Sequence, residues 1–184
     1  MLIRADDALL LVVDLQDRLM PALAEGDATA RHALDLMATA AELDVPIVVS
    51  EHCVDKLGGS LPTVRDAAHA TGATIVNKTH FSCASEPGFL GMLERLGRRQ
   101  VVLVGAEAHV CVMQTGLSLL AAGHAVFVVA DAVASRDPAQ KALALQRLQG
   151  AGAAVVSSEM VMFEWLGCAN HPAFRQVLPR IKRG

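Results

Sequence analysis

Short apolar runs alternate with longer amphipathic stretches along the whole chain. The apolar runs fall at residues 8–14, 45–50, 73–77, 101–104, 125–129 and 153–156, and they are typical of strands buried on both faces. The stretches between them place alanine and leucine at helical spacing and predict helices at 28–43, 63–70, 88–96, 111–122 and 137–149. The pattern therefore predicts six strands that alternate with helices.

Strands that alternate with helices build a parallel sheet with right-handed crossovers. Six of them favour an α/β, doubly wound (Rossmann-like) fold: a three-layer sandwich with strand order 3-2-1-4-5-6 and helices on both faces. At 184 residues the chain is expected to form a single domain, 1–184. The switch point of this order lies between the first and fourth strands, so a site is expected at their carboxyl ends.

Glycine, proline and acidic positions refine the boundaries of these elements. Pro87 is expected just inside helix 88–96, since prolines favour the first helical turn, and Gly123 is expected to cap helix 111–122. Gly58 and Gly59 predict that 51–61 is a loop over the site. Asp131 is expected at the end of the fifth strand.

Composition excludes several classes of partner. A net charge of −3 gives no basic footprint, and 3% aromatic residues argue against a stacking platform, so no nucleic-acid partner is expected. No apolar run approaches the ~20 residues that span a bilayer, so no membrane partner is expected, and the N-terminal run predicts a strand rather than a signal peptide. The cysteines are widely spaced and suggest no disulfide framework, which points to a cytoplasmic location.

Three chemically active side chains are predicted to meet at the switch point. Cys111 falls near the start of helix 111–122, where unpaired N–H groups favour an anion, so its thiol is expected to ionise easily. Asp14 ends the first strand and could act as a general base, while Lys78 follows the third strand and could hold both charges. The alternatives are a buried apolar cysteine, a helix-capping aspartate and a solvated lysine.

Nucleotide-binding motifs are absent from the sequence. No G-x-G-x-x-G follows the first strand, and no G-x-x-x-x-G-K-[ST] occurs, so the dinucleotide and P-loop hypotheses lose support. No cofactor is expected.

Five longer segments together cover nearly the whole chain: LLLVVDLQ, NKTHFS, VGAEAHVCVMQTGLSLL, VFVVADAVASR and EMVMFEWLGCANHPAF. They resemble the isochorismatase-like cysteine hydrolases, and most closely the isochorismatase-domain-containing branch of unassigned substrate. The resemblance implies that Asp14, Lys78 and Cys111 are the catalytic aspartate, lysine and nucleophile. It also implies a cis peptide between Ala106 and Glu107, with the backbone N–H groups of Glu107 and Cys111 forming an oxyanion hole.

The resemblance further implies hydrolysis of a C–N bond, in an amide or a ureido or carbamoyl group of a small molecule, through a cysteine thioester. It implies a homo-oligomer as well. Two other functions stay open: isochorismatase-type ether hydrolysis, and a non-hydrolytic redox-sensing or binding protein on the same fold.

Several residues have more than one interpretation. Gln16 and Phe81 are candidate substrate-binding residues, although Phe81 could equally belong to the core. His109 could tune the thiol or be a hydrogen-bonded structural histidine. Trp165 could lie in the core, at a subunit interface or in the pocket wall.

The segment Glu51-His52-Cys53 occupies the place of the Asp-x-His metal motif that nicotinamidases of this family carry. It does not reproduce that motif and has no second histidine close by, so a surface loop is expected rather than a metal site. This departure puts nicotinamidase activity in doubt.

Overall fold

Strand β1 (Ala8–Val13) lies in the middle of the sheet because all of its side chains are apolar and buried. In the computed structural model, which describes residues 1–183, β1 pairs in parallel with β2 (Ile47–His52) and with β4 (Gln100–Ala106). Strand β3 (Thr74–Lys78) lies beyond β2, and β5 (Ala125–Ala134) and β6 (Ala154–Val156) lie beyond β4. The all-parallel order β3-β2-β1-β4-β5-β6 confirms the predicted fold class.

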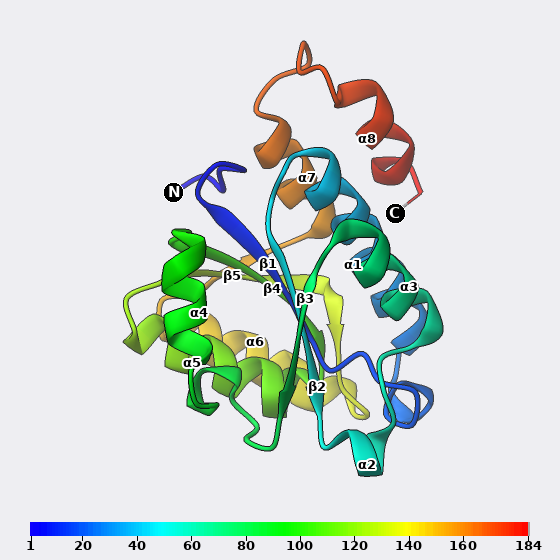
Figure 1. Ribbon diagram of the computed structural model, residues 1–184, viewed down its shortest axis with the longest axis vertical. Coiled ribbons are helices and arrows are strands. Elements are labelled where there is room, and N and C mark those ends of the chain that lie inside the picture. Colours follow the sequence, from blue (N-terminus) through cyan, green and yellow to red (C-terminus); the bar gives the residue numbers. More distant parts are fainter. Residues whose placement is uncertain (184) are drawn as a thin grey trace.

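Helices cover both faces of this sheet (Figure 1). One layer contains α1 (Gly26–Glu42), α3 (Pro62–Thr71), α7 (Ser158–Leu166) and α8 (Phe174–Ile181). The other contains α4 (Phe89–Leu96), α5 (Met113–Ala121) and α6 (Pro138–Gly150). Alternate β1 side chains enter the two cores: Leu10 and Val12 face the α1 layer, and Leu9 and Leu11 face the α5 layer.

Short helical turns fill the connections at the carboxyl ends of the strands. Segment 51–61, predicted as a loop, instead continues β2 as far as His52 and then forms the short helix α2 (Val54–Leu57). Turn η1 (Met20–Ala22) follows β1, and turn η2 (Cys83–Ser85) follows β3. A π-helical turn, η3 (Ala108–Val112), connects β4 to α5.

Two predicted boundaries are wrong for local reasons. Pro87 lies before the helix rather than inside it, because Gly88 takes the left-handed conformation and caps α4, which begins at Phe89. Strand β5 continues past Asp131 through a shift of register, so Asp131 does not end the strand. The Asp131 carboxylate instead accepts hydrogen bonds from the Ser158 N–H and hydroxyl, at 2.8 and 2.6 Å, and anchors the start of α7.

The C-terminal helices complete the core on the α1 side. Trp165 is buried there with Val161 and Val177, so it belongs to the core rather than to the wall of a pocket. None of the helices formed by residues 1–183 combines the length and the apolar character that crossing a membrane requires.

Candidate functional site

Asp14 is the first residue beyond β1, and its backbone turns sharply there, with φ at 51°. Its amide N–H donates to the Ser50 carbonyl of β2 at 3.1 Å. The turn places the carboxylate at the carboxyl edge of the sheet while keeping it completely buried. A buried carboxylate requires partners, because desolvation of an unpaired charge is costly.

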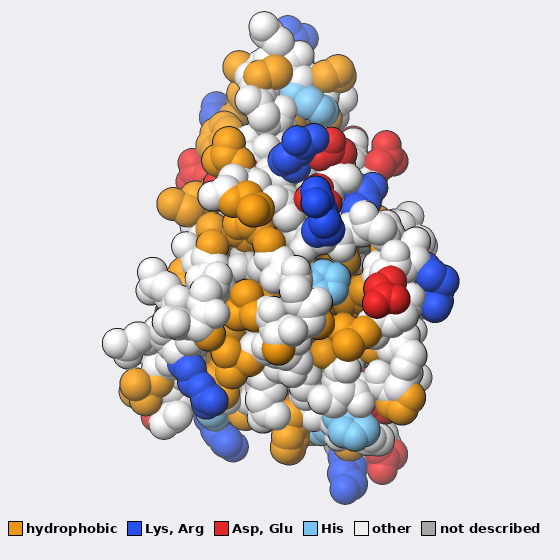
Figure 2. Space-filling view, turned by 90° about the vertical axis from the view of Figure 1, so that its left-hand side faces the viewer, with side chains coloured by type: hydrophobic (Ala, Val, Ile, Leu, Met, Phe, Trp, Pro, Cys, Tyr) orange, Lys and Arg blue, Asp and Glu red, His pale blue; other side chains and the backbone are white. Residues whose placement is uncertain are grey.

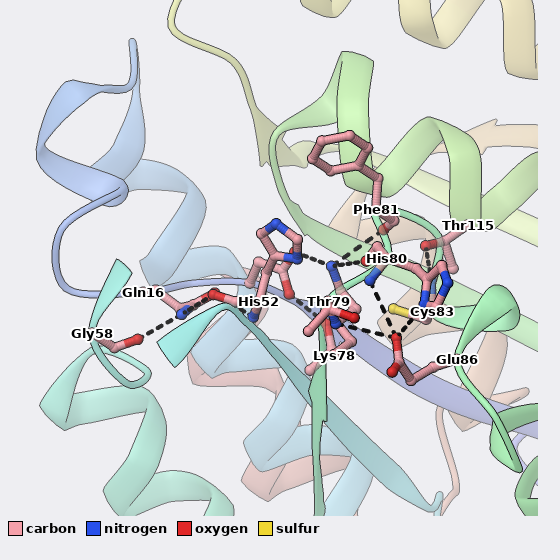
Figure 3. A network of polar contacts seen from close by, with 12 residues as sticks. Gln16, His52, Gly58, Lys78, Thr79, His80, Phe81, Cys83, Glu86 and Thr115 are labelled. Atoms are coloured by element: carbon pink, nitrogen blue, oxygen red, sulfur yellow. Dashed lines mark hydrogen bonds and ion pairs between the residues drawn. The ribbon is translucent and has the colours of Figure 1, made fainter. Parts of the chain in front are cut away.

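Lys78 ends β3 and supplies the first of these partners. Its Nζ lies 2.7 Å from Asp14 Oδ2, and both side chains are fully excluded from solvent. Nζ also donates to the carbonyl oxygens of His80 and Phe81, each at 3.2 Å (Figure 3). Burial disfavours the charged ammonium, but the Asp14 carboxylate and the neighbouring Cys111 outweigh it and raise the pKa of Lys78. Lys78 is therefore a fully bonded cation, which excludes the solvated-lysine alternative.

Cys111 lies in the π-helical turn η3 and is 6% exposed. Asp14 and Lys78 both lie close enough to the Cys111 thiol to shift its pKa. Burial raises the pKa of Cys111 strongly, the Asp14 charge raises it further, and Lys78 lowers it by less. The expectation of an easily ionised thiol is wrong for the resting protein, because desolvation exceeds the effect of the helix start. Cys111 is therefore a protonated thiol that lies beside a carboxylate.

Ser50 is a site residue that the sequence pattern does not single out. It lies in β2, and its hydroxyl donates to Asp14 Oδ1 at 2.7 Å. Both residues are completely buried. The only sequence feature that could have identified Ser50 is its place as a polar residue at the end of an apolar run. Many residues in such places simply begin a loop.

Gln16 has a structural role that differs from the predicted substrate contact. Its Oε1 accepts from the His52 N–H at 2.7 Å, and its Nε2 donates to the carbonyls of His52 and Gly58 at 3.0 and 2.6 Å (Figure 3). Both N–H groups of the amide are therefore used, and the side chain is completely buried. Gln16 holds the end of β2 and α2 in place.

Phe81 lies at the edge of the site and not in the core. Its side chain is 51% exposed, and its ring lies 5.4 Å from the His52 ring. In Figure 3 the ring points away from the polar network around Lys78. A role in lining the substrate pocket stays a prediction.

The turn before Cys111 is held by its own side-chain contacts. The peptide between Ala106 and Glu107 is cis, as the resemblance implies. The Glu107 carboxylate accepts a hydrogen bond from the Arg136 N–H at 3.0 Å. His109 Nδ1 lies 2.9 Å from Ser135 Oγ, which favours the structural interpretation of this histidine.

The Glu51-His52-Cys53 segment does not fit a metal ion. Glu51 Oε1 already accepts hydrogen bonds from the N–H and the hydroxyl of Ser60, both at 2.7 Å. Among residues 1–183, no three His, Cys, Asp or Glu side chains gather as a metal site would require. No catalytic step is therefore assigned to a metal here.

The raised thiol pKa predicts a loss of stability at alkaline pH. Above about pH 8.5 an unfolded thiol releases its proton, whereas folded Cys111 retains it. The folded state then binds more protons than the unfolded state, so the free energy of unfolding falls with rising pH, by about 1 kcal/mol per pH unit for one thiol. Denaturant unfolding from pH 8 to 10.5 should show a shallower decline in Cys111→Ala than in the wild type. Identical slopes would contradict the assignment.

Comparison with known proteins identifies a family of similar sequences. The Isochorismatase domain family model matches residues 8–160. Isochorismatase domain-containing protein 1 of Salmo salar is 35% identical over 170 residues, which are 92% of this chain, and the chain spans only 59% of that relative's length. Isochorismatase domain-containing protein 2A of Mus musculus is 32% identical over 96% of this chain and 84% of its own.

Solved structures of other proteins share the fold of this chain. The MAR1 Ribonuclease structure from Caenorhabditis elegans superposes with a TM-score of 0.91 at 31% identity and covers 99% of this chain and 93% of its own. The YcaC gene product of Escherichia coli superposes with a TM-score of 0.86 at 22% identity, over 100% and 97% of the two chains, and shows the shared fold. With the family match spanning most of its length, the chain belongs to the isochorismatase family.

Proposed function

We propose that this protein is a cysteine hydrolase that cleaves a C–N bond of a small amide, ureido or carbamoyl compound through a thioester on Cys111. The observation that carries the proposal is the buried Asp14–Lys78 ion pair beside a protonated, nearly buried thiol. A structural cysteine requires neither a carboxylate nor an ammonium as its neighbour. A nucleophilic cysteine with a high pKa requires a base, and the proximity of the Asp14 carboxylate supports Asp14 as that base.

In the first half-reaction, Asp14 takes the proton from Cys111 as the sulfur attacks the substrate carbonyl carbon. The carbonyl oxygen gains negative charge and is received by the backbone N–H groups of Glu107 and Cys111. The C–N bond then breaks as the intermediate collapses. The nitrogen leaves with the proton held by Asp14, so an amine or ammonia departs and a thioester remains.

In the second half-reaction, Asp14 accepts a proton from water as the water oxygen attacks the thioester carbon. The C–S bond breaks, Cys111 recovers its proton from Asp14 and the acid product leaves. Lys78 remains charged throughout, and its cation balances the negative charge that moves between Asp14 and Cys111. The redox-sensing alternative loses support, because sensing favours a low-pKa, accessible thiol.

A substrate screen tests this proposal directly. Small primary amides, ureido acids and carbamoyl compounds are incubated with the protein, and released ammonia or amine is measured, with Cys111→Ala as the blank. Intact-protein mass spectrometry after an acid quench should reveal an acyl adduct, and peptide mapping should place it on Cys111. The wild type should release ammonia or an amine from at least one of these classes of compound, and Cys111→Ala should release neither from any of them.

The same screen separates the competing functions. It includes isochorismate and a short RNA, because the family's name and the name of the C. elegans relative raise those two substrates. Turnover of either one that survives in Cys111→Ala, with no acyl adduct from any amide, would contradict the thioester mechanism.

We also propose that the protein assembles as a homo-oligomer in the cytoplasm. The E. coli YcaC protein is described as an octameric hydrolase, and exposed large apolar side chains occur here on the N-terminal segment and α7. They include Leu2, Met160 and Phe163, and Figure 2 shows hydrophobic side chains exposed over much of one face. All cysteines of residues 1–183 are free, which suits a reducing compartment. Light scattering should give a molar mass at least twice that of the monomer.

A further inference from the structure

Each oxygen of the Asp14 carboxylate accepts a hydrogen bond from a different strand. Oδ2 accepts a hydrogen bond from Lys78 Nζ of β3, and Oδ1 accepts one from the Ser50 hydroxyl of β2, both at 2.7 Å. Ser50 also accepts the Asp14 N–H through its own carbonyl and pairs in register with Val13 of β1. The side chain and the backbone of one serine therefore fix the direction of the carboxylate.

A second buried contact connects Ser50 to the helix that follows the nucleophile. The Cys83 thiol lies next to the hydroxyls of Ser50 and Thr115. The Cys83 N–H donates to Thr115 Oγ1 at 2.9 Å (Figure 3), and Thr115 lies in α5, one helical turn beyond Cys111. Ser50, Cys83 and Thr115 are each at least 99% buried, so water does not compete for these contacts.

Cys83 remains a thiol within this cluster. Burial raises the pKa of Cys83, and the neighbouring hydroxyls oppose that shift only in part. Its S–H is thus available to point toward a hydroxyl oxygen, which leaves the Ser50 hydrogen free to point toward Asp14. Cys83 therefore contacts both hydroxyls as a protonated thiol.

We propose that Ser50, supported by Cys83 and Thr115, is the positioning residue that holds Asp14 in the orientation and charge state it needs to act as base toward Cys111. The inference rests on the proposed function of Asp14. A hydrogen bond donated to a carboxylate favours its charged form, and a bond to one particular oxygen also fixes its plane. Lys78 contacts only Oδ2, so the Ser50 hydroxyl is the donor that a neighbouring strand supplies to Oδ1.

The pH dependence of the thiol's reactivity reports on this hydrogen bond. The titratable groups that face Asp14 are Lys78 of β3, His52 of β2, Cys83 of η2 and Cys111 of η3. Burial and the Lys78 charge lower the pKa of His52, while the pKa values of the two thiols and of Lys78 are raised. In mildly acidic solution the thiols therefore stay protonated and Lys78 stays charged, whereas His52 changes charge in this range. An acid limb that persists in His52→Gln therefore reports on the Asp14 carboxylate and not on His52.

The experiment measures the rate at which iodoacetamide alkylates Cys111 between pH 3.5 and 9, with peptide mapping to identify the modified thiol. In the wild type the rate should rise through an acid limb to a plateau, and Asp14→Asn should lower the plateau about 100-fold. In Ser50→Ala the midpoint of the acid limb should move up by about one pH unit, since the charged carboxylate has lost a donor. Ser50→Thr, which keeps the hydroxyl, should restore the midpoint.

Ser158→Ala is the matched control, because Ser158 is also buried and donates to a carboxylate, that of Asp131, at 2.6 Å. It should lose similar stability without moving the midpoint. If Ser50→Ala does not fold, Thr115→Val probes the same chain of contacts from its other end and should move the midpoint in the same direction. An unmoved midpoint in both variants would overturn the inference. If Asp14→Asn alkylates as fast as the wild type, the proposed function itself fails.

Discussion

Replacement of Cys111 by alanine is expected to reduce amide turnover by about 10⁵-fold or more while the protein stays folded. The covalent intermediate cannot form without the sulfur, and removal of a nucleophile typically costs nearly all of the chemical rate. The loss of stability should be small, because only one buried sulfur atom is removed. The measurement is ammonia release under single-turnover conditions, together with thermal unfolding.

Cys168→Ala is the matched control for this change. Cys168 is an exposed free cysteine in the connection between α7 and α8, so its replacement should leave both turnover and unfolding unaltered. Comparable losses of activity in the two variants would indicate a general effect of cysteine removal. Full activity in Cys111→Ala would exclude the thioester mechanism.

Substitution of Gly105 by alanine is expected to prevent stable folding, with an effect on the free energy of unfolding of about 4 kcal/mol or more. Gly105 lies in β4, and its φ of 120° is unfavourable for any residue with a side chain. An added Cβ would clash with the Val13 carbonyl oxygen of β1, which is backbone and cannot rotate away. Strands β1 and β4 would have to move apart next to Asp14.

Gly150→Ala tests whether this effect is specific. Gly150 ends α6 without a left-handed backbone angle, and a Cβ added there would meet nothing within 4 Å. Alanine there should leave the protein unchanged or stabilise it by up to about 1 kcal/mol. Chemical denaturation and the yield of folded protein compare the two variants, and a folded Gly105→Ala of wild-type stability would contradict the packing of β1 on β4.

The positions of Asp14 and Lys78 at one edge of the sheet could be predicted from the sequence, because both residues stand at the ends of apolar runs. Asp14 follows one such run and Lys78 ends another, and a parallel sheet brings these ends to one edge. The hydrogen bonds of the Gln16 side chain to His52 and Gly58 could not be predicted in this way. They depend on two backbone carbonyls, one at the end of β2 and one just after α2, and nothing in the local pattern around Gln16 shows where those carbonyls lie.

The state of the Cys111 thiol shows the same limit more sharply. A position near a helix start predicts a low pKa, but the pKa is the sum of burial and of every charge nearby. The π-helical turn places Cys111 below the surface and beside the Asp14 carboxylate, and those two effects reverse the prediction. The proposed mechanism therefore depends on the role that the sequence predicts for Asp14, the base that deprotonates the thiol during the reaction.

The sequence by itself determined the order of the strands, and it predicted that Asp14, Lys78 and Cys111 lie close together at one edge of the sheet. It could do so because hydrophobic periodicity and chain connectivity are local properties that parallel topology converts into position. Only the tertiary structure decided which charges are buried, which oxygen each donor contacts, and that Ser50, Cys83 and Thr115 stand behind the carboxylate. Those properties depend on desolvation and on contacts between residues more than 30 positions apart, and a linear pattern does not encode either.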